Sequence, residues 1–222
     1  QLATFLQPDQ TPASSSSAAT SRVANRPVSL PAFSSLLPSG VEGDNAARLA
    51  LACGHDTISE APAARWDSEE NFEAVVLQRM RHGGYMHGSE LFDRNAFGVP
   101  SAEAAVMNPL QRLLLEHGYA ALHASGRRRA NLLHSGTGVF VGSWAGDYGS
   151  ILHSGAARRS IYALSADSAA VMVGRLSFVL GLQGPCTSSD TACSASLVAC
   201  HSALRAVQLA ECDPSVVGGG NM

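Results

Sequence analysis

The order of apolar and polar residues predicts alternating strands and helices in the second half of the chain. Residues 137–142 (TGVFVG) form a short run of β-branched and aromatic residues between glycines, which is typical of a buried strand. Upstream, Asn108 and the proline after it suit the start of an amphipathic helix that should end near Gly126. A second helix is expected over residues 167–179, because a glycine and a Gly-Pro pair follow it as stop signals.

The last stretch predicts a strand, a tight turn, a helix and another strand. We expect the strand over residues 186–190, the turn over 191–193, the helix over 194–210 and the second strand over 216–218. The helix would bury a core stripe of Leu197, Cys200, Leu204 and Val207. This spacing is that of a βαβ unit, so we expect an α/β fold in which helices cover a mainly parallel, mixed sheet.

The first 27 residues contain a Ser/Ala/Thr-rich stretch that has few large apolar side chains and no periodicity. Such a segment cannot bury enough surface to order itself, so we interpret residues 1–27 as a linker or disordered segment. Its serines and two arginines also resemble an organellar transit peptide, although the chain begins with Gln rather than Met. The expected location is therefore the cytoplasm, or an organelle such as a plastid if this segment derives from a transit peptide.

Composition narrows the class of protein. The 222 residues are 45% hydrophobic, which is enough for one packed domain, and the formal net charge is −3. A chain without a basic surplus is not expected to bind nucleic acid. No apolar run approaches the ~20 residues that span a bilayer, so no membrane span is expected.

The five cysteines are odd in number and form no CxxC pair, which favours a reducing compartment. Cys193 and Cys200 would lie ~10 Å apart along one helix, too far for two sulfurs to bind one zinc ion, and we expect no metal. Cys193 falls on a turn at a helix start, where the dipole favours a thiolate and Ser194 or Ser196 could cap the helix. From the turn alone, a buried structural cysteine is the competing interpretation.

The motif DTACSASL at residues 190–197 resembles the active-site signature of β-ketoacyl synthase domains in polyketide synthases, usually DTACSSSL. The resemblance continues on both sides, through VGRLSFVLGLQGP (173–185) and ECDPSVVGGGNM (211–222). Upstream, LFDRNAFGVPSAEAAVMNPLQRLLLE (91–116) and DTISEAPAARWD (56–67) resemble further blocks of the same family. The chain is identified as the N-terminal part of such a domain, over residues 28–222.

This resemblance implies the thiolase-like fold, a five-layer αβαβα arrangement in a homodimer, of which this chain would form the N-terminal half. It also implies that Cys193 takes an acyl group from the phosphopantetheine of an acyl carrier protein. A malonyl-type extender then loses CO₂ and attacks that acyl group, in a decarboxylative Claisen condensation of polyketide or fatty acid biosynthesis. No cofactor is expected to bind directly, and the partners would be the carrier protein and other domains of a polyketide synthase.

The family completes its active site with two histidines and a glycine-rich loop, whose motifs do not occur in these 222 residues. The chain by itself is therefore expected to be inactive in condensation. His201 lies ~12 Å along the helix from Cys193, which indicates packing rather than proton transfer. Six further histidines are placed in loops or on exposed helix faces: His82, His87, His117, His123, His134 and His153.

Residues 28–45 depart from the family, because the first strand is degenerate and Pro31 would remove a hydrogen bond from it. Asn108 also replaces the usual Asp. The alternative to an enzyme is therefore a catalytically degenerate synthase fold that acts as a scaffold or binding module. A cysteine hydrolase would need a histidine within hydrogen-bond reach of Cys193, and the sequence shows no such arrangement.

Overall fold

The computed structural model describes residues 2–8, 27–62, 73–144 and 146–221. The chain divides into two compact units, a larger one from residues 1–34 and 90–222 and a smaller one from residues 35–89. The larger unit contains the central sheet and Cys193. None of the helices within the described ranges is both long enough and apolar enough to cross a membrane.

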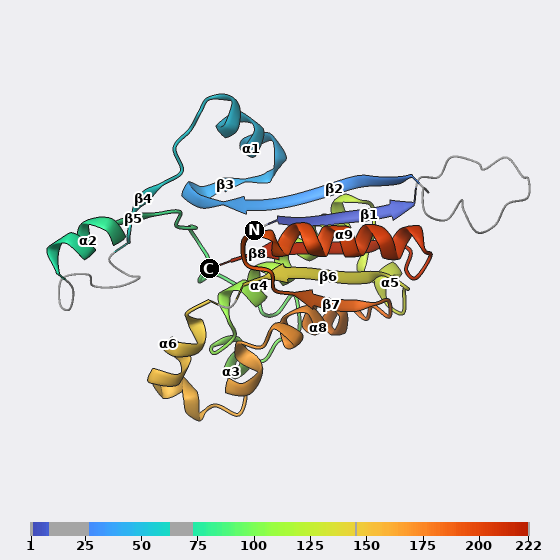
Figure 1. Ribbon diagram of the computed structural model, residues 1–222. Helices are drawn as coiled ribbons and strands as arrows, with labels where there is room; N and C mark the ends of the chain where they lie inside the picture. The colour runs from blue at the N-terminus through green and yellow to red at the C-terminus, as the bar shows by residue number, and fades with distance from the viewer. Residues whose placement is uncertain (1, 9–26, 63–72, 145, 222) are drawn as a thin grey trace, which may run out of the picture. The chain divides into compact units, whose positions relative to one another are not determined.

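The sheet of the larger unit is mixed, so the expected mixed sheet is confirmed, but parallel pairs do not predominate in it (Figure 1). Its strands are β1 (Leu2–Pro8), β2 (Val28–Leu37, to Ser34 in this unit), β6 (Gly138–Ser143), β7 (Cys186–Ser189) and β8 (Ser215–Gly220), in the order β2-β1-β8-β6-β7. Strand β6 pairs in parallel with β7 on one side and with β8 on the other, whereas β1 runs antiparallel to β8. The predicted βαβ unit is confirmed, with β6 lying between its two strands.

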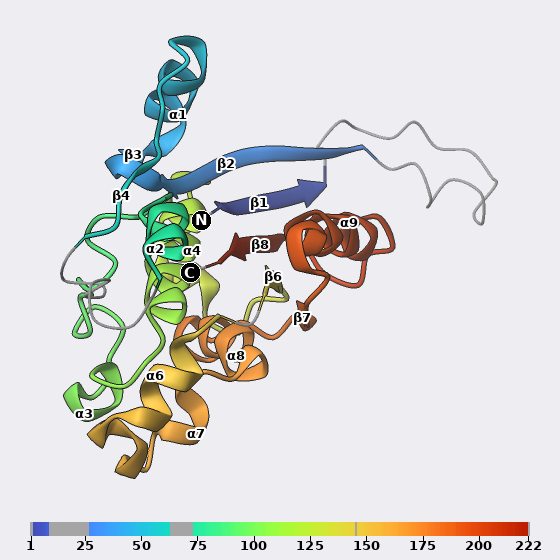
Figure 2. The ribbon, with the colours of Figure 1, turned by 60° about the vertical axis from the view of Figure 1, so that its left-hand side comes forward.

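Helices cover both faces of this sheet, giving three layers (Figures 1 and 2). Val139 and Val141 of β6 belong to one core cluster with residues of α4 (Pro109–Ala124) and α8 (Ala169–Leu180). Phe140, which points to the other face, belongs to a second cluster with α9 (Ala195–Gln208). The alternation along a single strand thus separates the two helical layers, as the period-two geometry of a strand requires.

Shorter helical segments connect these elements in the larger unit. They are α3 (Ser101–Ala104), α5 (Arg129–Leu132), α6 (Tyr148–Ser154), η3 (Ala156–Arg159), α7 (Ala163–Ala166) and the 3₁₀ turn η4 (Ala192–Ser194). Val106, Leu152 and Ala166 form a small core of their own beneath α6 and α7.

The smaller unit is built from short elements. After the end of β2 come η2 (Pro38–Gly40), β3 (Val41–Glu42), α1 (Gly43–Ala52), β4 (Ser59–Glu60), α2 (Ala74–Met80) and β5 (His82–Gly83). Strand β3 pairs antiparallel with the end of β2, and β4 pairs antiparallel with β5. The last residues of the DTISEAPAARWD motif, 63–67, lie outside the described residues.

Local signals in the sequence position the long helices as predicted. Asn108 caps α4, since its Oδ1 accepts the backbone N–H of Leu110 at 2.8 Å. Ser168 caps α8 through the N–H of Val171, and Gly181 ends α8 in the left-handed conformation at φ 69°. Both helices, and the fully buried strand β6 between glycines, confirm the predictions.

Two expectations for the first part of the chain need correction. Residues 2–8 are not linker, because they form β1 and bury Ala3 and Leu6 against the rest of the sheet; residues 9–26 lie outside the described ranges. Residues 28–37 form a complete strand despite Pro31. Strand β3 pairs with Leu36 and Leu37, so this pairing does not use the N–H group that Pro31 lacks.

The predicted core stripe of the last helix is also partly wrong. Leu197 is 76% exposed, whereas the side chains that α9 buries are mostly alanines. They are Ala195, Ala199, Ala203, Ala206 and Val207. Residues 195–208 do form the predicted helix, but the residues that face the sheet are small, because α9 packs very close to the strands.

Candidate active site

Three parallel strands end at the same edge of the sheet and bring three chain segments together. Ser143 of β6 is in register with Gly220 of β8, and Gly142 is in register with Ser189 of β7. The residues that follow are Trp144, the turn that carries Cys193, and Asn221. In α/β proteins the carboxyl ends of parallel strands are the usual place for a ligand or active site.

The turn before Cys193 is held by its own side chains. Ala192 has a positive φ of 52°, a conformation that a residue with a Cβ atom rarely adopts. The Oδ1 atom of Asp190 accepts the N–H of Ala192 at 3.1 Å, and Ser194 Oγ donates to the Thr191 carbonyl at 2.8 Å. The Ser194 hydroxyl is thus used in the turn and does not cap α9, contrary to our expectation. The turn presents Cys193 as an exposed side chain.

Glycines let the start of α9 lie directly on the strands. A Cβ atom at position 142 would lie 2.2 Å from the carbonyl oxygen of Ala195, and one at position 219 would lie 2.4 Å from Ser196 Oγ. No real Cβ atom tolerates such distances, so Gly142 and Gly219 are required for this approach. The close contact brings the N-terminal end of α9, where the helix dipole favours negative charge, to the edge of the sheet.

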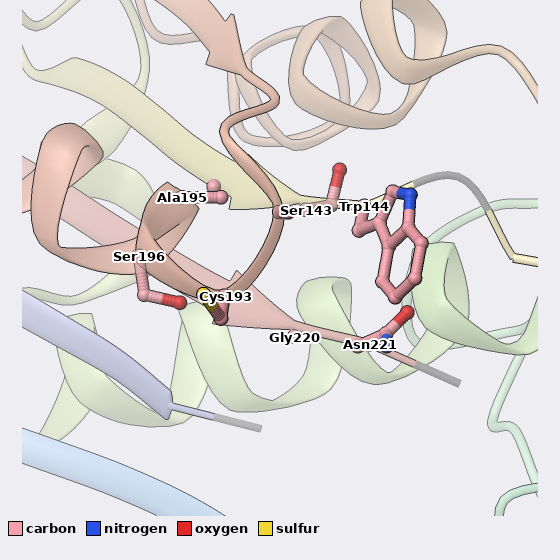
Figure 3. A pocket seen from close by; sticks show the side chains of 10 residues that line it. Ser143, Trp144, Cys193, Ala195, Ser196, Gly220 and Asn221 are labelled. Carbon is pink, nitrogen blue, oxygen red and sulfur yellow. The ribbon is translucent and has the colours of Figure 1, made fainter.

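A cavity of about 500 Å³ opens at this edge (Figure 3). It is lined by Gly142, Ser143, Trp144, Ala192, Cys193, Ala195, Ser196, Gly219, Gly220 and Asn221. Cys193 therefore lies in a cavity formed by the ends of β6 and β8 and the start of α9. A volume of this size is sufficient for a small-molecule substrate or an acyl chain.

The other four cysteines have different surroundings. Cys53 and Cys186 are exposed, Cys200 is half-buried and Cys212 is buried, and all five thiols are free. Burial raises the pKa of the Cys212 thiol to about 11, which keeps it protonated and unreactive at neutral pH. Within the described part of the chain, Cys193 is the cysteine that lines this cavity.

The histidines do not supply a base to Cys193. None lines the cavity described above, and His201 is exposed on α9. His117 corrects our expectation of an exposed helix face, since it is 8% exposed and its Nδ1 lies 2.8 Å from Ser34 Oγ. Nor do the described residues contain a cluster of three or more His, Cys, Asp and Glu side chains that could hold a metal ion.

A second, smaller cavity of about 80 Å³ lies beside the first. Ser143 and Trp144 line both cavities, and Asp190, Asp167 and Asn108 contribute to the smaller one. The amide Nδ2 of Asn108 donates to Asp167 Oδ1 at 2.6 Å, so this residue caps α4 and binds Asp167 at the same time. Asn108, which replaces the aspartate usual in the family, thus has Asp167 as its hydrogen-bond partner.

Comparison with known proteins identifies the family of this chain. The sequence model of the family "Beta-ketoacyl synthase, N-terminal domain" matches residues 25–222. The chain belongs to this family.

Among curated β-ketoacyl synthase relatives, a phenolphthiocerol synthesis type I polyketide synthase of Mycobacterium bovis is 37% identical over 88% of this chain. A polyketide synthase of Streptomyces halstedii is likewise 37% identical over 90% of the chain. This chain spans only 9% and 4% of the lengths of these two proteins.

Solved structures agree with the thiolase-like fold inferred for the chain. The ketosynthase from module 6 of the bacillaene synthase of Bacillus subtilis 168 superposes with a TM-score of 0.72 at 29% identity. An oxazolomycin ketosynthase domain of Streptomyces albus JA3453 gives 0.74 at 29% identity. Each match covers 85% of this chain but only 30% and 33% of the solved chain, respectively.

Two features of this synthase site were not found from the sequence. Trp144 and Asn221 directly follow β6 and β8, and each lies within three residues of the end of a predicted strand, so their place near the strand ends could have indicated the cavity. Gly142 was interpreted only as the end of a strand, because its contact with Ala195 joins segments far apart in sequence.

Proposed function

We propose that this chain provides the acyl-accepting nucleophile of a β-ketoacyl synthase, and that Cys193 is that nucleophile. The observation that supports this is the position of Cys193, exposed on a strand-to-helix turn and lining the 500 Å³ cavity of a chain in this family. A thiolate is a strong nucleophile, and the thioester that it forms remains electrophilic enough to be passed to carbon.

In the first step, the Cys193 thiolate attacks the carbonyl carbon of an acyl thioester carried on the phosphopantetheine of an acyl carrier protein. The new sulfur–carbon bond forms as the carrier's own sulfur–carbon bond breaks, and the carrier thiolate leaves and takes up a proton. In the second step, a malonyl-type extender loses CO₂, and its carbanion attacks the acyl carbonyl. The product is a β-ketoacyl thioester, and Cys193 is released as a thiolate.

The two steps make different demands on the protein. Acyl transfer needs an accessible thiolate, whereas decarboxylation needs donors for the developing enolate, and losing one such donor typically costs on the order of 10² to 10³ in rate. No histidine lines the cavity within the described residues. We therefore expect residues 1–222 alone to support acylation of Cys193 but no condensation.

The partners follow from the same proposal. The relatives named above are polyketide synthases, which supports a role beside other synthase domains and a polyketide rather than a fatty acid product. We propose an acyl carrier protein as the source of both substrates.

The edge strand β7 supports a homodimer. Its residues 186–188 are exposed and it is the last strand of the order, so its outer backbone groups can pair with β7 of a second copy. Sedimentation of the full-length synthase at micromolar concentration should give a dimer. A stable monomer would contradict this part of the proposal.

The decisive experiment is acylation of the purified protein by an acyl carrier protein thioester, followed by peptide mapping. We expect one acyl group on Cys193 and none in a Cys193→Ala variant. With radiolabelled malonyl carrier protein, the 222 residues should release no more CO₂ than this variant. The absence of Cys193 acylation would favour the alternative function, a scaffold that keeps the fold without turnover.

A further inference from the structure

Trp144 is the large side chain of the cavity that contains Cys193. The other residues that line this cavity are all Gly, Ala, Ser, Cys or Asn. Most of the space that a ligand could fill is therefore defined by backbone and by one indole ring. Changes of volume at other lining positions are constrained, because Gly142 and Gly219 touch α9.

The indole is exposed at the site rather than packed into the core. Trp144 follows the end of β6 directly and is 55% exposed, although β6 itself is fully buried. In Figure 3 its ring extends from the end of the strand toward Asn221, and the Cys193 thiol lies at the other side of the view. An aromatic ring of this kind buries roughly 150–250 Å² when covered, so leaving it exposed forgoes a large stabilisation.

Trp144 borders two cavities. Trp144 and Ser143 are the residues common to the 500 Å³ cavity and the 80 Å³ cavity. The smaller cavity is bounded by Leu110 and Met172 as well as by polar groups. Removing the indole would enlarge the space at the side of the Cys193 cavity that Trp144 lines.

We propose that Trp144 is a specificity-determining residue that limits the size of the acyl chain on Cys193. This inference rests on the proposed function, because it requires Cys193 to accept acyl groups. A chain attached to the sulfur extends along the cavity, where the indole is the only large side chain among the described residues that line it. Short acyl groups fit in front of the ring, whereas long apolar chains need the space that the ring occupies.

The rate of acyl transfer should depend strongly on the length of the acyl chain. In an apolar pocket, one methylene more or less typically changes the specificity constant by about 10- to 200-fold. Replacing the indole with a methyl group removes far more volume than one methylene. The Trp144→Ala variant should therefore raise the ratio of octanoyl to acetyl transfer by at least roughly tenfold.

The test measures acylation of Cys193 in the purified protein with acetyl and octanoyl thioesters of N-acetylcysteamine, read by intact mass and peptide mapping. The quantity compared is the octanoyl-to-acetyl rate ratio in the wild type, Trp144→Ala and Trp144→Phe. The ratio should rise most in the alanine variant and less in the phenylalanine variant, which retains a smaller ring. Phe178→Ala is the matched control, because Phe178 is an aromatic residue of α8 that is 87% exposed and lines a different groove; its ratio should equal that of the wild type.

The outcomes separate this inference from the proposed function. If Cys193 accepts acetyl groups and the ratio is unchanged or lower in both Trp144 variants, the ring is not a size limit and this inference alone is wrong. If the wild type accepts neither thioester at Cys193, the proposed function fails, and the inference fails with it. Trp144→Phe keeps the test decisive if the alanine variant does not fold.

Discussion

The two faces of the central sheet are packed by different means. On the face covered by α4 and α8, large apolar side chains fill the layer, and Leu122 and Leu180 are at most 2% exposed. On the face covered by α9, the helix buries mainly alanines. The first face, which we call the thick face, is packed like an ordinary protein core. On the second, which we call the thin face, the helix and strand backbones lie in contact.

This difference shows how the fold serves the site. The thin face brings the first turn of α9 against the end of β6, and the turn that carries Cys193 therefore meets the cavity at the strand ends. The thick face supplies most of the buried apolar volume, and there the atoms closest to its glycines belong to side chains. Most of the buried apolar volume thus lies on one face of the sheet, whereas the geometry of the site depends on the other.

The largest effect should follow Gly142→Ala, which adds a Cβ atom 2.2 Å from the carbonyl oxygen of Ala195. Overpacking usually costs about 1–3 kcal/mol, and we expect more here because the obstructing atom is backbone and cannot rotate away. Thermal unfolding followed by circular dichroism should show a strongly lowered or absent transition. Acylation of Cys193 should be lost in parallel.

Two glycines on the thick face are the controls. At Gly118 the new Cβ would lie 3.0 Å from Leu176 Cδ2, a flexible side chain, so Gly118→Ala should cost much less. At Gly174, inside α8, no atom lies within 4 Å, and alanine there should stabilise by up to about 1 kcal/mol. Equal effects at positions 142 and 174 would contradict the distinction between the faces.

The next largest loss of stability should come from placing a small residue on the thick face or a large residue on the thin face. Leu180→Ala on the thick face should destabilise by about 2–5 kcal/mol through the cavity it leaves. Ala203→Leu on the thin face should cost about 1–3 kcal/mol through overpacking. Chemical denaturation measures both, and only the Ala203 variant should also slow acylation of Cys193. A leucine tolerated at position 203 without cost would mean that the thin face has spare room.

The hydrogen bond between Asn108 and Asp167 should contribute less to stability, and its loss should be recovered by a second substitution. Asn108→Asp would place a carboxylate against Asp167, where the amide now donates at 2.6 Å, and should cost about 1–3 kcal/mol. Asp167→Asn in the same chain should recover most of this loss, because a donor and an acceptor face each other again. Denaturation of the single and double variants forms a double-mutant cycle, and additive losses would disprove the coupling.

The smallest expected effect concerns the buried thiol in the core of the thin face. The folded pKa of Cys212 is about 11, above the ordinary 9.0, so between these values the unfolded state loses a proton that the folded state keeps. Stability should therefore be complete below pH 9 and fall as the pH rises toward 11. The chain has no lysine to titrate in this range. Stability curves of the wild type and Cys212→Ala should differ in slope there, and identical slopes would contradict the assignment.

Much of the larger unit followed from local sequence. Asn108 and Gly181 carry their helix signals within a few residues, and β6 is buried on both faces and hence continuously apolar. The strand, turn and helix around Cys193 could be predicted for the same reason, and the motif DTACSASL pointed to the family that the comparisons show.

Tertiary structure alone decided the rest. Residues 2–8 are too short a segment to predict beside the Ser/Ala/Thr-rich stretch, and they form a strand because the edge of β8 offers them backbone partners and a place to bury Leu6. The exposure of Leu197 and the burial of His117 depend on which face of a helix meets the sheet. The cavity itself joins Trp144, Cys193 and Asn221, which no local rule links. Sequence determines elements through short-range backbone preferences, whereas a site forms only when long-range packing brings their ends together.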